Sequence, residues 1–318
     1  MTFRALLLLL SLASFPAAAQ NYPWKTGRMV VPYPAGGTTD VLARRVAEVL
    51  RAKLGQTFVV ENRPGAQTQI GVQEILKAPA DGHTLLMATL STMSLNPVLL
   101  TSLNYKVEQL APVALVAKVP FSMDAALNFP PNSIAEVVAY AKANPGKVNI
   151  GTTGLGTSGH LIVEMFKAAA GIDVVPVHYK GGAPAIQDIL GGHLHMYFDG
   201  ATSSVPHYQG KRMKVLGITS EKRMPALPDV PTFVEAGLPS VVSYSWYGVV
   251  TRAGTPEKTV LQLNQVINDF VASPEMQEQL KKDAAVPGDL SPAGFAKMIA
   301  DETADMRRIV APLNLKLD

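Results

Sequence analysis

Apolar runs and helix-period patterns alternate along the first third of the chain. Short runs of apolar residues predict buried β-strands at 28–33, 58–61 and 84–89. Between these runs, apolar residues recur three or four positions apart, which predicts helices over 38–54 and 67–77. This repeated order of strand, helix and strand predicts an α/β fold with a mostly parallel sheet.

The alternation restarts in the second part of the chain. Strand-like runs are found at 111–118, 121–127, 148–151, 174–179, 196–199, 214–219 and 246–251. The apolar periodicity between them predicts helices at 133–144, 158–170 and 183–190. Three helices close the chain, and each has a proline in its first turn: Pro256, Pro274 and Pro292.

Two α/β units without a flexible linker predict two hinged lobes. The chain passes between the units near 117–120 and again near 243–246, and both segments read as strands rather than Gly/Ser tracts. Strands shared by both units would form the hinge between them. We therefore predict that lobe 1 comprises 20–117 and 246–318, and that lobe 2 comprises 118–245.

The first 19 residues have the pattern of a secretory signal peptide. Arg4 supplies a positive charge, residues 5–12 form an apolar run, and residues 17–19 are alanines suited to cleavage. The apolar run is shorter than the roughly 20 residues that span a bilayer, which favours cleavage over a membrane anchor. We predict cleavage after Ala19 and export of the mature protein to the periplasm.

The charge balance and the absence of cysteine argue against several classes of function. The chain has 28 basic and 25 acidic residues without a run of Lys and Arg, which argues against nucleic-acid binding. Cysteine is absent, so disulfides, thiolate metal sites, thiol catalysis and a lipoprotein anchor are excluded. No stretch after the signal peptide is long and apolar enough for a membrane span.

Three glycine-rich segments each join a predicted strand to a predicted helix. They are PYPAGGTTD at 32–40, GTTGLGTSGH at 151–160 and YKGGAP at 179–184. Glycines let the backbone approach a ligand, and a helix N-terminus offers free N–H groups and a partial positive charge to an anion. The simpler alternative for the first segment is a tight turn with Thr38 as the N-cap. Three such junctions at the carboxyl ends of strands favour a binding cleft for anions.

The sequence motifs for catalysis and metal binding are less specific than the three glycine-rich segments. Segment 151–160 contains G-x-G-x-x-G, but the expected acid does not end the next strand, so we reject dinucleotide binding. Ser158 and His160 are close in sequence, yet they do not form a G-x-S-x-G nucleophile elbow. His193 and His195 lack a third ligand at helical spacing, and a surface pair is the simpler interpretation. We predict no catalytic residue, metal or cofactor.

Six segments carry a resemblance to a known family. They are VPYPAGGTTDVLARR (31–45), VVENRPGA (59–66), DGHTLLMAT (81–89), GTTGLGTSGHLIVEMF (151–166), VPVHYKGGAPAIQDILGGHLHMYFD (175–199) and LPDVPTFVEAG (227–237). Through them the mature chain resembles the Bug-type extracytoplasmic solute receptors of tripartite tricarboxylate transporters. The resemblance implies a two-lobed, hinged periplasmic binding protein that captures a small carboxylate. It also implies a monomeric receptor that delivers this ligand to membrane permease subunits.

The resemblance also implies ligand contacts, carried over position by position. In the first unit these are Tyr33, Ala35, Gly36, Gly37, Thr38, Asp40, Ser91, Thr92 and Asn96. In the second unit they are Thr152, Thr153, Gly156, Thr157, Ser158, His160, Lys180, Gly181, Gly182, Ala183 and Asp199. Met93 stands where the family often has histidine, and an acid that is common near His195 is missing, so the resemblance does not name the carboxylate.

Helix starts in both units favour a dicarboxylate, on the argument that one carboxylate satisfies one lobe only. Two other classes stay open: a secreted hydrolase using Ser158 and His160, and a receptor for an inorganic anion or an amino acid. Asp199, at a strand end, is either an acid facing the ligand or an N-cap. Trp246 either faces the cleft or belongs to the hydrophobic core at the hinge.

Overall fold

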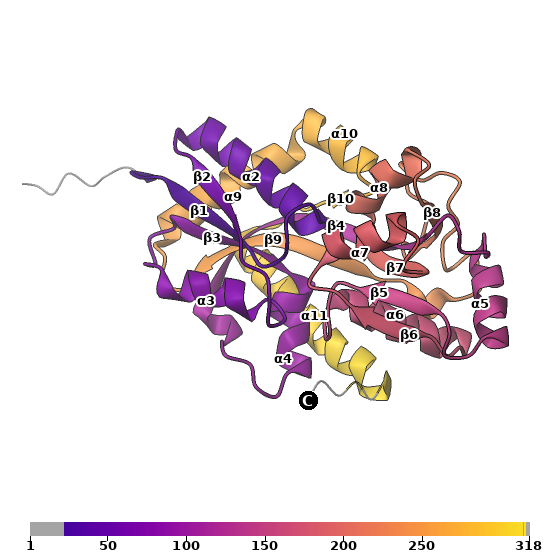
Figure 1. Cartoon of the computed structure of the whole chain (residues 1–318). Helices are drawn as coiled ribbons and strands as arrows, with labels where there is room; N and C mark the ends of the chain where they lie inside the picture. Colours follow the sequence, from indigo (N-terminus) through magenta and orange to yellow (C-terminus); the bar gives the residue numbers. More distant parts are fainter. Residues whose placement is uncertain (1–21, 314, 316–318) are drawn as a thin grey trace, which may run out of the picture.

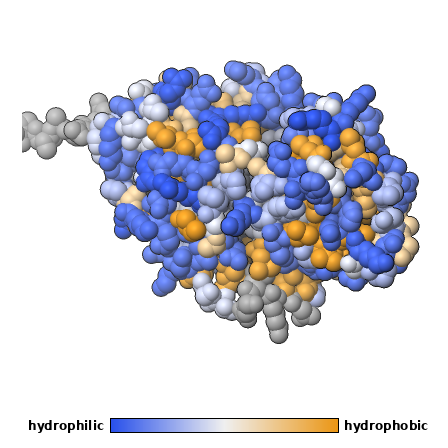
Figure 2. All heavy atoms as spheres, in the orientation of Figure 1, coloured by the Kyte–Doolittle hydropathy of each residue, from blue (hydrophilic) through white to orange (hydrophobic). Residues whose placement is uncertain are grey.

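Two α/β lobes lie side by side and share the long strand β4 (Figure 1). The computed structural model describes residues 22–313 and 315, so the predicted signal peptide lies outside the described residues. Within the described part of the chain, none of the helices combines the length and the apolar character that a membrane span needs. On the face drawn in Figure 2, hydrophobic residues form small groups among hydrophilic ones.

The first lobe is built on a sheet in which β1 pairs with β2 and β3 in parallel. β9 pairs antiparallel with both β3 and β4. The strands are β1 (Gly27–Val31), β2 (Phe58–Asn62), β3 (Thr84–Thr89), β9 (Tyr244–Arg252), β10 (Val286–Pro287) and the first part of β4 (Leu110–Ala125). The helices are α2 (Thr38–Leu54), α3 (Gln69–Lys77), α4 (Asn96–Leu99), α9 (Glu257–Ala272), α10 (Pro274–Lys282) and α11 (Pro292–Val310).

The second lobe has a smaller sheet in which β5 pairs in parallel with β6 and β7. The last part of β4 pairs antiparallel with β7 and β8. The strands are β5 (Asn149–Thr152), β6 (Val175–His178), β7 (Met196–Gly200) and β8 (Lys214–Ile218). The helices are α5 (Ile134–Ala143), α6 (Ser158–Ala170), α7 (Gly182–Leu190) and α8 (Ala201–Gln209).

Strand β4 belongs to both sheets. Residues 110–120 pair with β9 in the first lobe, and residues 121–125 pair with β7 and β8 in the second. The sequence predicted two strands here, at 111–118 and 121–127. The structure shows one strand, with Pro120 at the point where β4 changes partners. Proline is tolerated at such irregular positions, where the regular ladder is already interrupted.

Both faces of the first-lobe sheet are buried by helices. Along β1, Met29 and Val31 belong to one core with Leu42 of α2, whereas Val30 belongs to another core with Phe295 of α11. All of these side chains are fully buried, and burial of each contributes roughly 1.5–3 kcal/mol. Two buried faces explain why the strands read as continuous apolar runs rather than alternating ones.

Several local structures differ from the sequence predictions. Helix α3 begins at Gln69 rather than at residue 67, because residues 66–68 have a positive φ. A π-helical turn covers Ser91–Leu95, where the sequence predicted no helix. Helix α8 was also not predicted, because its sequence is rich in hydroxyl residues and contains Pro206.

Trp246 belongs to the hydrophobic core and does not face the cleft. Its side chain is buried, and its ring lies 5.2 Å from that of Phe295, edge to face. The core interpretation of this residue is therefore confirmed.

Candidate ligand site between the lobes

The glycine-rich segments of the two lobes meet across the boundary between the lobes. The Thr38 hydroxyl of the first lobe donates a hydrogen bond to the Gly200 carbonyl at 3.1 Å. In the opposite sense, the Ser158 N–H of the second lobe donates to Ser91 Oγ at 3.0 Å. These direct bonds hold the lobes in contact, an arrangement that we call closed.

Four helices begin around a small cavity at this boundary, which we call the inner cavity. Its volume is about 30 Å³, which exceeds the roughly 10–15 Å³ that one water molecule needs. Helix α2 of the first lobe and helices α6, α7 and α8 of the second contribute the start of their first turn or the residue before it. The lining residues are Tyr33, Gly37, Thr38, Thr39, Thr89, Phe121, Thr153, Ser158, Gly182, Asp199, Gly200, Ser245 and Tyr247.

Helix N-termini from both lobes therefore surround one point. Each N-terminus has backbone N–H groups without partners in its helix and a partial positive charge, and both favour an anion. The structure thus brings helix starts of both lobes to one place rather than to two separate ones. The preference for a dicarboxylate stays a prediction.

Asp40 and Gly36 stabilise the first glycine-rich segment from inside the first lobe. The Asp40 carboxylate accepts hydrogen bonds from the Gly36 N–H at 3.0 Å, from Arg44 at 2.9 Å and from Asn62 at 2.9 Å. Burial raises the pKa of Asp40, but the bonds from Arg44, Asn62 and Gly36 outweigh it and hold this pKa below its usual range. The N-cap of α2 is Gly37 rather than Thr38.

Asp199 is the one charged residue among those that line the inner cavity. Its Oδ1 accepts a hydrogen bond from the Gly200 N–H at 2.7 Å, and its Oδ2 bonds the Ser203 hydroxyl in the first turn of α8. Burial raises the pKa of Asp199 to about 6, although these bonds act in the opposite direction. Asp199 thus lines the cavity and supports the start of α8, but the N-cap of this helix is Gly200, so the N-cap interpretation of Asp199 is wrong.

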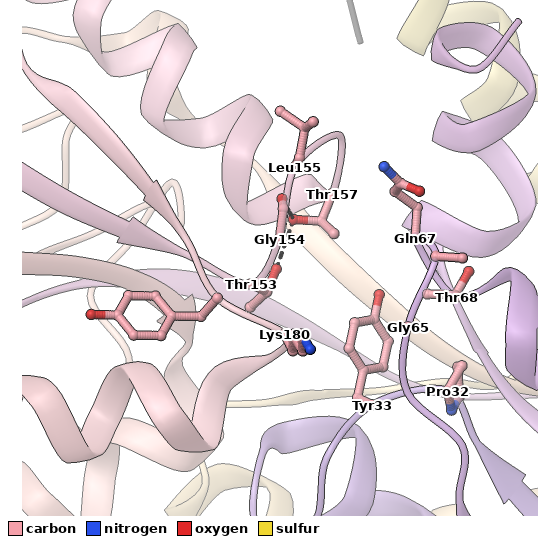
Figure 3. Close-up of a pocket in the computed structure, with 12 residues that line it drawn as sticks. Pro32, Tyr33, Gly65, Gln67, Thr68, Thr153, Gly154, Leu155, Thr157 and Lys180 are labelled. Carbon is pink, nitrogen blue, oxygen red and sulfur yellow. Dashed lines mark hydrogen bonds between the residues drawn. The ribbon is translucent and has the colours of Figure 1, made fainter. Parts of the chain in front are cut away.

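A larger cavity, which we call the outer cavity, adjoins the inner one. Figure 3 shows residues that line the outer cavity. Its volume is about 160 Å³, and Tyr33 and Thr153 line both cavities. Lys180 is the only charged residue among those that line it. The lining residues are Pro32, Tyr33, Gly65, Ala66, Gln67, Thr68, Thr153, Gly154, Leu155, Thr157, Tyr179 and Lys180.

The turn at 65–68 is part of this lining, and the sequence analysis did not include it among the ligand contacts. Ala66, Gln67 and Thr68 have φ values of 45°, 47° and 72°. Non-glycine residues rarely adopt a positive φ, so the residue types at 66–68 do not predict this turn. The available signal was its position at the end of segment 59–66, at a junction between a strand and a helix.

The predicted contact residues fall into three groups. One group lines a cavity: Tyr33, Gly37, Thr38, Thr153, Thr157, Ser158, Lys180, Gly182 and Asp199. A second group lies in the glycine-rich segments that meet at the lobe boundary: Ala35, Gly36, Gly181 and Ala183. A third group lines neither cavity and bonds other parts of the protein: Asp40, Ser91, Thr92, Asn96, Thr152, Gly156 and His160.

Asn96, one of the predicted contacts that line neither cavity, supports a turn that does. Its buried amide donates to the Gln67 carbonyl at 2.6 Å, to the Thr68 hydroxyl at 3.3 Å and to the Tyr105 hydroxyl at 3.2 Å. The Tyr105 hydroxyl in turn donates to the Thr92 carbonyl at 2.5 Å. These bonds tie the π-helical turn to the turn at 65–68 that lines the outer cavity.

His160 supports the second glycine-rich segment. Its Nδ1 accepts a hydrogen bond from the Gly156 N–H at 3.2 Å, and its ring lies 4.6 Å from that of His178. Burial, together with the nearby His178 and Lys167, lowers the pKa of His160 to about 4, so this histidine is neutral at pH 7.

Ser158 and His160 do not form a nucleophile–base pair. The Ser158 hydroxyl is hydrogen-bonded to Ser91 Oγ at 3.3 Å, and Nδ1 of His160 accepts a hydrogen bond from the Gly156 N–H. The described residues also contain no group of three or more His, Cys, Asp or Glu side chains arranged to hold a metal ion. The geometry gives the hydrolase alternative no support.

Comparison with known proteins identifies the family. Residues 42–315 match the tripartite tricarboxylate transporter family receptor. The chain belongs to this receptor family. BugT of Bordetella pertussis is 34% identical over 304 residues, which cover 95% of this chain and 93% of BugT. The predicted family resemblance is confirmed, and the receptors of this family are solute-binding proteins.

Two solved receptor structures share the fold and contain a ligand. R. palustris Rpa4515 with adipate is 32% identical, with a TM-score of 0.90 over 93% of this chain and 99% of that one. MatC from Rhodopseudomonas palustris with bound malate is 28% identical, with a TM-score of 0.85 over 91% of this chain and all of that one. The α/β fold of two-lobed periplasmic binding proteins, as predicted from the sequence, is confirmed.

Proposed function

We propose that this receptor captures a small dicarboxylate between its lobes in the periplasm and delivers it to the membrane permease of a tripartite tricarboxylate-type transporter. The observation that carries this proposal is the inner cavity, around which helix N-termini of both lobes begin. The related structures hold adipate and malate, which are both dicarboxylates. The receptor acts as a monomer and uses no cofactor.

The same cavity explains how a ligand would close the lobes. An anion there contacts α2 of the first lobe and α6, α7 and α8 of the second only when the lobes meet. The ligand therefore has a higher affinity for the closed arrangement and shifts the population toward it. We place the hinge at 117–120 and 243–246, between lobe 1 (20–117 and 246–318) and lobe 2 (118–245), because β4 passes from one sheet to the other there and β9 begins beside it.

We expect a dicarboxylate to bind with a Kd near micromolar, about −8 kcal/mol. At about 1,000 times that concentration, the native state gains roughly 4 kcal/mol, a rise in melting temperature on the order of 8 °C. Thermal unfolding with succinate, glutarate, adipate and malate tests this expectation, with phosphate, sulfate and amino acids as alternative ligands. No shift with any carboxylate, or a larger shift with one of the alternatives, would contradict the proposal.

We also expect the mature protein to begin at Gln20 and to be found in the periplasmic fraction of its host. The reason is the short apolar run followed by alanines at 17–19. N-terminal sequencing of the fractionated native protein checks this expectation. A native protein that still begins at Met1 would show that the segment is not removed.

A further inference from the structure

The outer cavity presents polar groups that the first carboxylate does not use. Lys180, on the second lobe, is exposed and forms no hydrogen bond or ion pair with the described residues. Gln67, on the first lobe, has a half-buried side chain whose amide has no partner in the described part of the chain. Two unpaired polar side chains from different lobes thus line one cavity.

The position of Gln67 is held by the surrounding structure. It is the middle of three consecutive non-glycine residues in the left-handed region, with a φ of 47°. Such conformations persist where the surroundings enforce them, and they cluster at ligand sites. Here the buried Asn96 amide bonds the Gln67 carbonyl at 2.6 Å. In Figure 3, Lys180 lies beside Tyr33, and Gln67 lies on the turn that faces the loop with Gly154 and Thr157.

We propose that the outer cavity binds the second acidic group of a dicarboxylate and that Lys180 and Gln67 select for it. This inference rests on the proposed function, because the first carboxylate occupies the inner cavity. The lining of the outer cavity contains one cation and no carboxylate, which favours an anion. The Gln67 amide can donate a hydrogen bond to a carboxylate oxygen. A methyl group in the same place would leave both side chains without a partner.

The size of the cavity sets the length of the ligand. An internal cavity of about 150 Å³ binds benzene, so a cavity of 160 Å³ has room for about six non-hydrogen atoms. On the same scale the inner cavity, of about 30 Å³, adds room for about one more. The two cavities together therefore match a short dicarboxylate. Glutarate is therefore the probe, and pentanoate is the matched monocarboxylate of the same chain length.

Calorimetry with both probes on the mature protein tests the assignment. Lys180→Gln removes the cation, and a hydrogen bond to a charged group is worth about tenfold or more in affinity. We expect Lys180→Gln to weaken glutarate binding about tenfold and pentanoate binding less than twofold. Gln67→Gly removes the amide at a φ that glycine adopts freely, and Gln67→Glu adds a repelling charge. Both are expected to weaken glutarate binding more than pentanoate binding.

Lys211→Gly is the matched control for Gln67→Gly. It makes the same backbone change at a φ of 54°, at a position that lines neither cavity. We expect it to leave the ratio of the two affinities unchanged. If wild-type protein binds glutarate and pentanoate equally, or if the variants weaken both equally, the assignment of the outer cavity is overturned while the receptor function stands. If neither these probes nor succinate or adipate bind, the proposed function fails as well.

Discussion

Replacement of Gly181 with alanine is expected to weaken dicarboxylate binding at least 100-fold. A Cβ on Gly181 would lie 2.4 Å from Pro34 Cδ of the opposite lobe, whereas carbon atoms in contact lie about 3.5–4.0 Å apart. The added methyl group would therefore separate the lobes by about 1 Å where their helix N-termini meet. A ligand between the separated lobes could no longer bond the helix N-termini of both. If it loses two hydrogen bonds, at about 1.5–3 kcal/mol each, its affinity falls at least about 100-fold.

Gly171→Ala provides the matched control for this substitution. Gly171 also has a positive φ and lies in the second lobe at the end of α6, and a Cβ added there would meet no atom within 4 Å. Both substitutions force alanine into a backbone region that favours glycine, so both should lower thermal stability. Only Gly181→Ala should lose affinity in calorimetry. A folded Gly181→Ala protein that binds like the wild type would show that the closed arrangement is not the ligand-bound one.

The affinity for dicarboxylates is expected to fall as the pH rises from 6 to 8. Asp199 lines the inner cavity, and burial raises its pKa to about 6. When protonated, it can donate a hydrogen bond to the ligand carboxylate; when ionised, it repels that carboxylate. Binding that requires the protonated form weakens by up to about tenfold per pH unit above this pKa. His160, with a pKa of about 4, stays neutral throughout this range.

Asp199→Asn should make the affinity independent of pH between 6 and 8. The neutral amide keeps an oxygen for the Gly200 N–H, so the start of α8 keeps one of its two bonds. Calorimetry of the variant and the wild type at pH 6, 7 and 8 provides the measurement. An unchanged pH dependence in the variant would assign it to another group, such as the buried Asp124, whose pKa is raised well above its usual range.

The Asp199 carboxyl also makes the free energy of unfolding depend on pH. Because the pKa of Asp199 rises on folding from 3.8 to about 6, the native state keeps this proton at pH values where the unfolded chain has lost it. The native state therefore loses stability as the pH rises from about 4 to 6, and this contribution stays constant above pH 6. At about 1.4 kcal/mol per pKa unit, Asp199→Asn should gain roughly 2 kcal/mol over the wild type between pH 4 and pH 7, because the unfolded carboxyl is already partly ionised at pH 4. Chemical denaturation of both proteins at these two pH values checks the difference.

Local patterns in the sequence were sufficient for most of the secondary structure. Helices α2 and α6 and strand β3 have the bounds that the sequence predicted. The glycines that follow the two helices, Gly55 and Gly171, have the positive φ expected at such ends. These features depend on residues a few positions apart, so periodicity and end signals along the chain report them directly. The resemblance of whole segments was likewise sufficient for the family and its two-lobed fold.

The geometry of the ligand site depends on contacts between distant segments, and no local pattern reports these. Thr38 bonds Gly200 across 162 positions, and this contact brings the helix starts of both lobes to one cavity instead of two. The turn at 66–68 is held by Asn96, which lies 29 positions from Gln67 in the sequence. The pKa of Asp199 follows from its burial, which α8 and the opposite lobe complete. Burial, charge proximity and backbone strain belong to the packed chain, because they arise only when separate elements exclude water from the same place.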